Sequence, residues 1–142
     1  RLEGIEKYLR RLKHYVSFKV LELPELKNTK SLSADQQKAK EAELIQKNIS
    51  STDQLILLDE KGKELSSVQF SGFLNKKMLG SVQHMVFVVG GPYGFDPGIQ
   101  NRADDKISLS RMTFSHQMVR LFFIEQLYRS FTILKGEPYH HE

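Results

Sequence analysis

The stretch His84–Gly98 reads HMVFVVGGPYGFDPG and decides the fold of this 142-residue chain. Its run Met85–Val89 is β-branched and aromatic and is bounded by glycines, which predicts a fully buried strand of a parallel sheet. Open α/β sheets bind ligands at the carboxyl ends of such strands, where this turn lies. Gly90 and the glycines after it lack a Cβ and would let backbone N–H groups approach a ligand. A tight turn without a ligand explains two adjacent glycines equally well.

Strand and helix patterns alternate along the rest of the chain, which predicts an α/β domain with a mostly parallel sheet flanked by helices. Its length fits one domain, residues 1–142. We expect strands at 16–23, 54–59 and 107–110, and a turn at 60–63. We expect helices at 2–12, at 33–47 on the surface, at 66–80 with Val68, Phe73 and Leu74 inward, and at 97–103.

The helix that follows Phe114 is apolar in every direction. Such a helix is buried on more than one side, and a chain this small covers one side by itself. The sequence therefore predicts a homodimer built around residues 115–131. Charged and amide residues interrupt the apolar run, which falls short of a membrane span of about 20 apolar residues.

Composition and motifs limit the function classes. The net charge of +4 suits a polyanionic partner but does not identify one. The chain has no cysteine, and its five histidines show no metal-binding spacing, so we expect no metal. GGPYGFDPG lacks the Lys-Ser/Thr of a phosphate loop, and no GxSxG hydrolase motif is present. No signal peptide or membrane span is visible, so we expect a cytoplasmic location and no membrane partner.

Four motifs carry a family resemblance: GGPYGF (90–95), ISLSRMTFSHQMVR (107–120), EQLYR (125–129) and GEPYH (136–140). Together they resemble the ribosomal large-subunit RNA methyltransferase H family, a bacterial branch of the SPOUT (α/β-knot) methyltransferases. LDEKGKELSS and YLRRLKHY extend the resemblance over essentially the whole chain. It implies a C-terminal trefoil knot, bound S-adenosyl-L-methionine, a homodimer, and N3 of a pseudouridine in the 23S rRNA of assembled ribosomes as substrate. It also implies a strand before Arg1, which we expect in the functional protein.

The same resemblance implies the site residues. The cofactor would be held, largely through backbone groups, by Leu58, Gly90, Leu109, Ser110, Arg111, Met112, Thr113 and Phe114. The candidates for catalysis are His116, Arg120, Tyr139 and His140.

Each catalytic candidate also has a structural alternative. His116 would act as a base or orienting group, or only make a structural hydrogen bond. Arg120 and Arg129 would contact RNA, or form an intersubunit ion pair with Glu125. Tyr139 and His140 would contact the substrate base, or belong to a disordered end.

Two choices remain open at the level of the whole protein. The basic cluster of the first helix, Arg10, Arg11, Lys13 and His14, is a solvated face or an RNA contact. The function is rRNA methylation or, alternatively, non-catalytic ribosome binding or assembly by a knotted protein.

Overall fold

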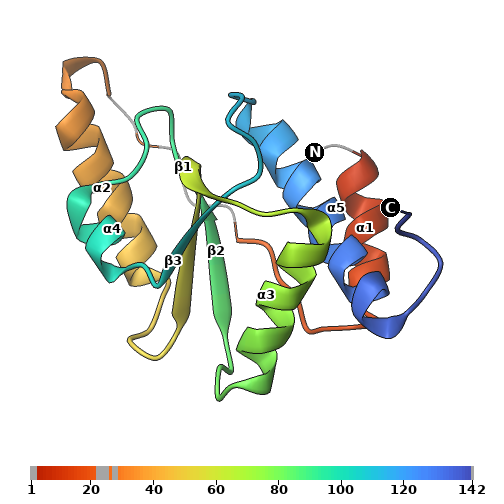
Figure 1. Ribbon diagram of the computed structural model, residues 1–142. Helices are drawn as coiled ribbons and strands as arrows, with labels where there is room; N and C mark the ends of the chain where they lie inside the picture. The colour runs from red at the N-terminus through yellow and green to blue at the C-terminus, as the bar shows by residue number, and fades with distance from the viewer. Residues whose placement is uncertain (1–2, 22–25, 27–28, 142) are drawn as a thin grey trace.

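The computed structural model describes residues 3–21, 26 and 29–141 of the chain. Three parallel strands form its sheet in the order β2-β1-β3, with β1 at Gln54–Glu64, β2 at Met85–Val89 and β3 at Asp105–Ser108. As Figure 1 shows, α2 (Ala34–Lys47) and α4 (Pro97–Arg102) lie on one side of the sheet. On the other side lie α1 (Glu3–Leu12), α3 (Ser67–Leu79) and α5 (His116–Lys135). The α/β class with a parallel sheet is confirmed, while the knot stays a prediction.

Strand β1 is the centre of this arrangement because it supplies both cores. Ile56 and Leu58 belong to the core beneath α1, α3 and α5, whereas Leu55 and Leu57 belong to the core beneath α2 and α4. All four side chains are buried. A parallel strand covered on both faces is apolar without interruption, as β1 is from Leu55 to Leu58.

The helices begin at the residues that the sequence marks as caps. Ser33 and Ser66 each form a capping box, with Gln36 and Gln69 respectively. Asp96 accepts a hydrogen bond from Gly98 N–H at 2.8 Å and is followed by Pro97 at the first helical position. Capping of this kind satisfies the N–H groups that a helix leaves without a partner at its start.

The predicted turn at 60–63 is wrong, because β1 continues through it to Glu64. The ladder with β3 is irregular there: Ile107 pairs with both Leu58 and Lys63. A Cβ at Gly62 would lie 2.7 Å from the backbone nitrogen of Ile107. The glycine that resembled a turn signal instead permits two backbones to approach closely.

Two further strand predictions need correction. Strand β2 is half-buried along its whole length and not fully buried, because it lies at the edge of the described sheet beside β1 alone. Residues 16–21 are not a strand, and the rest of the predicted strand, 22–23, lies outside the described residues. Val16, Phe18 and Val20 still pack against the core. The alternation of apolar and polar residues therefore indicates an extended segment with one buried face, and not a strand paired with a neighbour.

Helix α5 is covered more fully by its own chain than we predicted. It packs between α1 and α3 on one face of the sheet (Figure 1), which accounts for apolar residues on several of its sides. Val68, predicted to face inward from α3, is exposed because Phe70 and Leu74 are the residues of that helix that enter the core. The exposed apolar side chains near the start of α5 are Phe114 and Met118, with Met112 before them.

The close approach at Gly62 gives a stability prediction. Gly62→Ala should cost about 1–3 kcal/mol because its methyl group meets backbone atoms that cannot rotate away. The melting temperature should fall by roughly 3–10 °C. The matched control is Gly72→Ala in α3, where nothing lies within 4 Å of the added carbon. That change should raise stability by up to about 1 kcal/mol. Equal melting temperatures for the two variants would contradict the close approach.

Candidate active site

The predicted cofactor residues meet at the carboxyl edge of the sheet. In the β1 ladder, Leu58 pairs with Val89 on one side and with Ile107 on the other. Gly90 follows Val89 directly, and the loop Leu109–Phe114 begins two residues after Ile107. Three segments far apart in the sequence therefore converge at one place (Figure 1), the edge at which parallel α/β sheets bind ligands.

Two carboxylates at the end of β1 hold the loop 109–114. Glu64 forms an ion pair with Arg111, whose Nε lies 2.9 Å from Glu64 Oε1. Glu60 Oε2 accepts a hydrogen bond from Thr113 Oγ1 at 2.9 Å. The side chains of Arg111, Met112 and Thr113 are exposed, so these contacts order a loop that packs little into the core. Sequence reasoning did not predict these two contacts, because contacts between distant segments leave no local pattern.

The glycine turn has its own internal packing. Gly94 donates a hydrogen bond from its N–H to Gly91 O at 3.1 Å, with a φ of 80° that glycine adopts easily. A Cβ at Gly90 would lie 2.8 Å from the ring of Phe95, which is buried. The absence of a side chain at position 90 therefore already has a structural reason, and ligand approach to it stays a prediction.

Glu41 of α2 lies directly against this turn. A Cβ at Gly91 would overlap Glu41 Oε2 and lie 3.0 Å from Oε1. Burial raises the pKa of the Glu41 carboxyl, while a hydrogen bond from Gln37 and the charge of His116 act in the opposite direction. Sequence reasoning placed this helix at the surface and missed Glu41, because only the contact with Gly91 distinguishes it from its charged neighbours.

His116 and Arg120 lie on the first two turns of α5, after the cap residue Ser115. His116 is exposed, and its charge reaches Glu41, so it belongs to the same edge as the glycine turn. Arg120 is one helical turn further and half-buried. Both residues are thus close to the loop 109–114 along the chain.

Tyr139 and His140 are elsewhere, in a tail that folds back on its own chain. Tyr139 Oη donates to Glu125 Oε1 at 3.1 Å and lies 3.3 Å from Tyr8 Oη. Burial, together with these two partners, raises the pKa of Tyr139. His140 Nδ1 lies 3.0 Å from Arg129 Nη1. The tail is therefore ordered through residue 140 by contacts with α1 and α5.

Arg129 is the centre of that polar cluster. Its Nη2 donates to Glu125 Oε1 at 2.7 Å, and its guanidinium lies 4.7 Å from the centre of the Tyr139 ring. The predicted pairing of Arg129 with Glu125 thus occurs within one helix and not between subunits, because residues four apart are neighbours on a helix.

The four catalytic candidates form two groups within one chain. Arg129, which contacts the tail, follows His116 by thirteen positions on the same helix, about 20 Å along its axis. His116 and Arg120 adjoin the carboxyl edge, whereas Tyr139 and His140 lie by the second half of α5.

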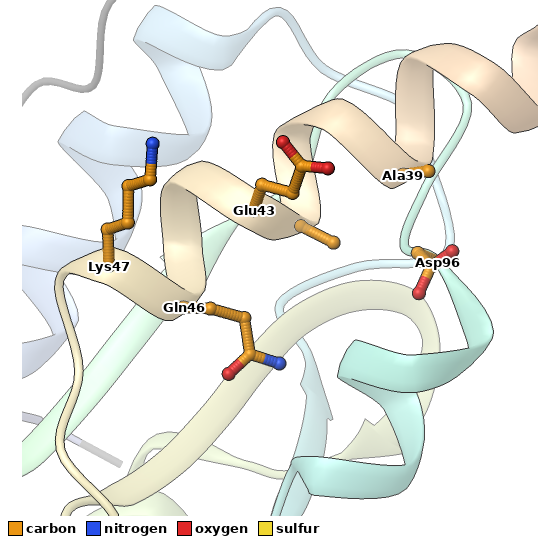
Figure 2. Close-up of a pocket in the computed structure, with 6 residues that line it drawn as sticks. Ala39, Glu43, Gln46, Lys47 and Asp96 are labelled. Atoms are coloured by element: carbon orange, nitrogen blue, oxygen red, sulfur yellow. The ribbon is translucent and has the colours of Figure 1, made fainter.

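A hollow lies beside α2 and the start of α4 (Figure 2). It is lined by side chains of α2 and by Asp96: Ala39, Ala42, Glu43, Gln46, Lys47 and Asp96. Asp96 is already the cap of α4, and the hollow is open to solvent. It holds none of the predicted site residues, so we do not assign it as the site.

The described residues hold neither a metal site nor a membrane-spanning helix. There, no three His, Asp or Glu side chains come together in a way that would hold a metal ion. Nor does any helix in that part of the chain have both the length and the apolarity to cross a membrane.

A parallel sheet whose carboxyl edge carries a glycine turn and an exposed loop is typical of α/β proteins that bind ligands there. The family model described as "Predicted SPOUT methyltransferase" matches residues 2–140, and the chain belongs to that family. The resemblance carried by the four motifs is confirmed. Membership of a methyltransferase family implies a methyl donor.

Similar curated proteins bear the name ribosomal RNA large subunit methyltransferase H. The protein from Flavobacterium johnsoniae is 61% identical over 138 residues, which cover 97% of this chain and 88% of that protein. The one from Parabacteroides distasonis is 57% identical over 141 residues, which cover 99% of this chain and 90% of that protein. The one from Bacteroides fragilis is 52% identical over 141 residues with the same coverage.

The tail cluster gives a second prediction. Tyr139→Phe should lower the free energy of unfolding by about 1 kcal/mol, because the Glu125 carboxylate loses a hydrogen-bond donor while the ring packing persists. Chemical denaturation measures the change. Tyr93→Phe is the matched control, since Tyr93 is 54% exposed, and it should change stability by less than about 0.5 kcal/mol. If both variants are neutral, the tail does not hold this conformation in solution.

Proposed function

We propose that the chain is an S-adenosyl-L-methionine-dependent methyltransferase that methylates N3 of a pseudouridine in 23S rRNA. The proposed substrate is the assembled ribosome in the cytoplasm, and the proposed active form is a homodimer of 1–142 domains. The observation that carries the proposal is the convergence of Leu58, Gly90 and the loop 109–114 at one edge, in a chain of a methyltransferase family. The name of the similar proteins, ribosomal RNA large subunit methyltransferase H, supports ribosomal RNA as the substrate.

The residues at this edge fit the donor. Leu58 is buried in the core and would meet the donor through its backbone. Leu109 is partly buried and Met112 is exposed, so these two side chains offer apolar surface for an adenine ring. The loop 109–114 has no regular secondary structure, so its backbone groups are suited to hydrogen bonds with a nucleoside. Glu41 Oε1 is a buried acceptor without a hydrogen-bond partner in the described chain, which fits a donor with positive charge.

The bound donor would supply an electrophilic methyl group on a sulfonium sulfur. The chain's part is to align the pseudouridine N3 with that methyl group, since positioning gives much of the acceleration in a displacement reaction. The N3 proton must leave as the new N–C bond forms. His116, exposed at the edge, can accept it as a neutral imidazole, and Arg120 can stabilise negative charge on the uracil oxygens.

The second group of candidates can reach the substrate only from another chain. Tyr139 and His140 are held beside Glu125 and Arg129, far from His116 of the same chain. We propose that the tail of one subunit serves the site of its partner, with Tyr139 and His140 next to the RNA. Exposed basic residues of α1, Arg10 and Arg11 among them, would contact RNA phosphates.

Methyl transfer to ribosomes tests this function. Purified full-length protein and S-adenosyl-L-methionine labelled in the methyl group should label 23S rRNA in 70S particles from a strain lacking the modification. Naked rRNA should be labelled far less, and the label should map to a pseudouridine. Met112→Asp should lower the donor affinity by roughly tenfold, because it places a charge on the apolar wall.

Two outcomes would separate the alternatives. Donor binding without any label would favour the non-catalytic ribosome factor or another substrate. The control for Met112, which is 74% exposed, is Leu79→Asp, at a residue 80% exposed at the far end of α3. Equal donor affinity for the two variants would remove Met112 from the proposed site.

The homodimer gives a separate prediction. Met118 and Phe114 are exposed apolar residues at the start of α5. Neighbouring exposed apolar residues of this kind often mark a surface that a partner covers. Met118→Asp should weaken the dimer at least about tenfold by burying an unpaired charge. Light scattering coupled to size exclusion measures the change, with Leu79→Asp again as control. A fully dimeric Met118→Asp would place the interface away from the start of α5.

A further inference from the structure

We propose that Glu41 is an acidic member of the candidate site and binds a positively charged group of the methyl donor. This inference rests on the proposed function, because it takes the carboxyl edge as the donor site. It assigns a role to α2, a helix whose composition gives no sign of one.

Geometry places Glu41 at the turn and not at the solvent face of α2. Its carboxylate lies where a side chain of Gly91 would otherwise be, with Cδ 3.1 Å from that Cβ position. Gly91 follows Gly90, the predicted donor contact at the end of β2. The charge of His116, at the start of α5, also acts on Glu41. The carboxylate therefore adjoins both the glycine turn and the first proposed catalytic residue.

The carboxylate keeps an unused acceptor. Glu41 Oε1 is buried, and within the described residues it has no hydrogen-bond partner. Burial also raises the pKa of this group, as expected when the charged form loses water without a full set of donors. Buried polar atoms are almost always paired, so an exception next to a ligand site indicates a partner that the ligand brings.

The negative charge of Glu41 indicates which kind of ligand group would pair with it. An ionised carboxylate only accepts hydrogen bonds, and it is stabilised most by a cation. The other carboxylates beside the loop, Glu60 and Glu64, are engaged with Thr113 and Arg111. No Lys or Arg of the described chain forms an ion pair with Glu41, in contrast to Glu64. The methyl donor has two groups of the required sign, its sulfonium and its α-ammonium.

Stability distinguishes this role from a structural one. A carboxylate that holds the turn in place would stabilise the fold, so its loss would lower the melting temperature. A carboxylate that waits for a ligand costs stability, because its charge is desolvated without a partner. Glu41→Gln keeps the size and removes the charge, so we expect weaker donor binding with an unchanged or raised melting temperature.

Calorimetric titration of the full chain is the test. The ligands are S-adenosyl-L-methionine and S-adenosylhomocysteine, which keeps the ammonium and has a neutral sulfur. Glu43→Gln is the matched control: Glu43 lies on the same helix, is exposed, and lines the hollow of Figure 2. Glu41→Gln should weaken binding of S-adenosyl-L-methionine by roughly tenfold or more, and Glu43→Gln should leave it unchanged.

The second ligand identifies the group that is bound. Equal weakening for both ligands assigns the ammonium, and weakening for S-adenosyl-L-methionine alone assigns the sulfonium. Unchanged affinity in Glu41→Gln, or weaker binding together with a lower melting temperature, would overturn the inference and leave the proposed function intact. Failure of the wild-type chain to bind either ligand would overturn the proposed function itself.

Discussion

The pairing of β1 with a neighbour on each side is the constraint on which the candidate site depends. Leu58 is paired with Val89 and with Ile107, so the glycine turn and the loop 109–114 must leave the sheet side by side. The approach of the two backbones at Gly62 brings the end of β1 close to β3. Glu60 and Glu64, beyond Leu58, then reach Thr113 and Arg111. One ladder thus both builds the core and fixes the loop that we propose as the donor cradle.

Not every polar group near this edge contributes to the fold. The ion pair of Arg111 with Glu64 is exposed, and such pairs stabilise a protein by less than about 1 kcal/mol. Its effect is to limit where the loop can lie. Glu41 is the opposite case, since its carboxylate is desolvated and incompletely paired. Proteins keep such groups at functional sites, where the loss of stability is offset by the affinity or rate that the group provides.

Local sequence patterns predicted most of the fold. Apolar runs and cap residues gave the buried β1, the capped helices and the class of the sheet, because each pattern depends on neighbours in sequence. The errors arose where tertiary contacts decide. Gly62 was taken for a turn, and Val16, Phe18 and Val20 were taken for a strand because an extended segment without a ladder partner alternates in the same way. Of the site, the motifs supplied the residues at the edge, but Glu41 lies in no motif, and the motif that contains Glu60 and Glu64 does not show their contacts with Thr113 and Arg111.

The arrangement of α5 explains why one chain is not a sufficient catalyst in the proposed mechanism. The helix presents His116 to the carboxyl edge at one end and holds the tail at the other, about 20 Å away. The tail is anchored by Glu125, Arg129 and Tyr8, so it does not swing to His116 of its own chain without breaking the hydrogen bonds of Tyr139 and His140. Two copies packed with their α5 helices antiparallel, about a two-fold axis near the middle of the helix, would bring the beginning of one helix toward the second half of the other. On that argument the exposed Phe114 and Met118 and the distant tail have one explanation: a substrate site that each chain completes for its partner.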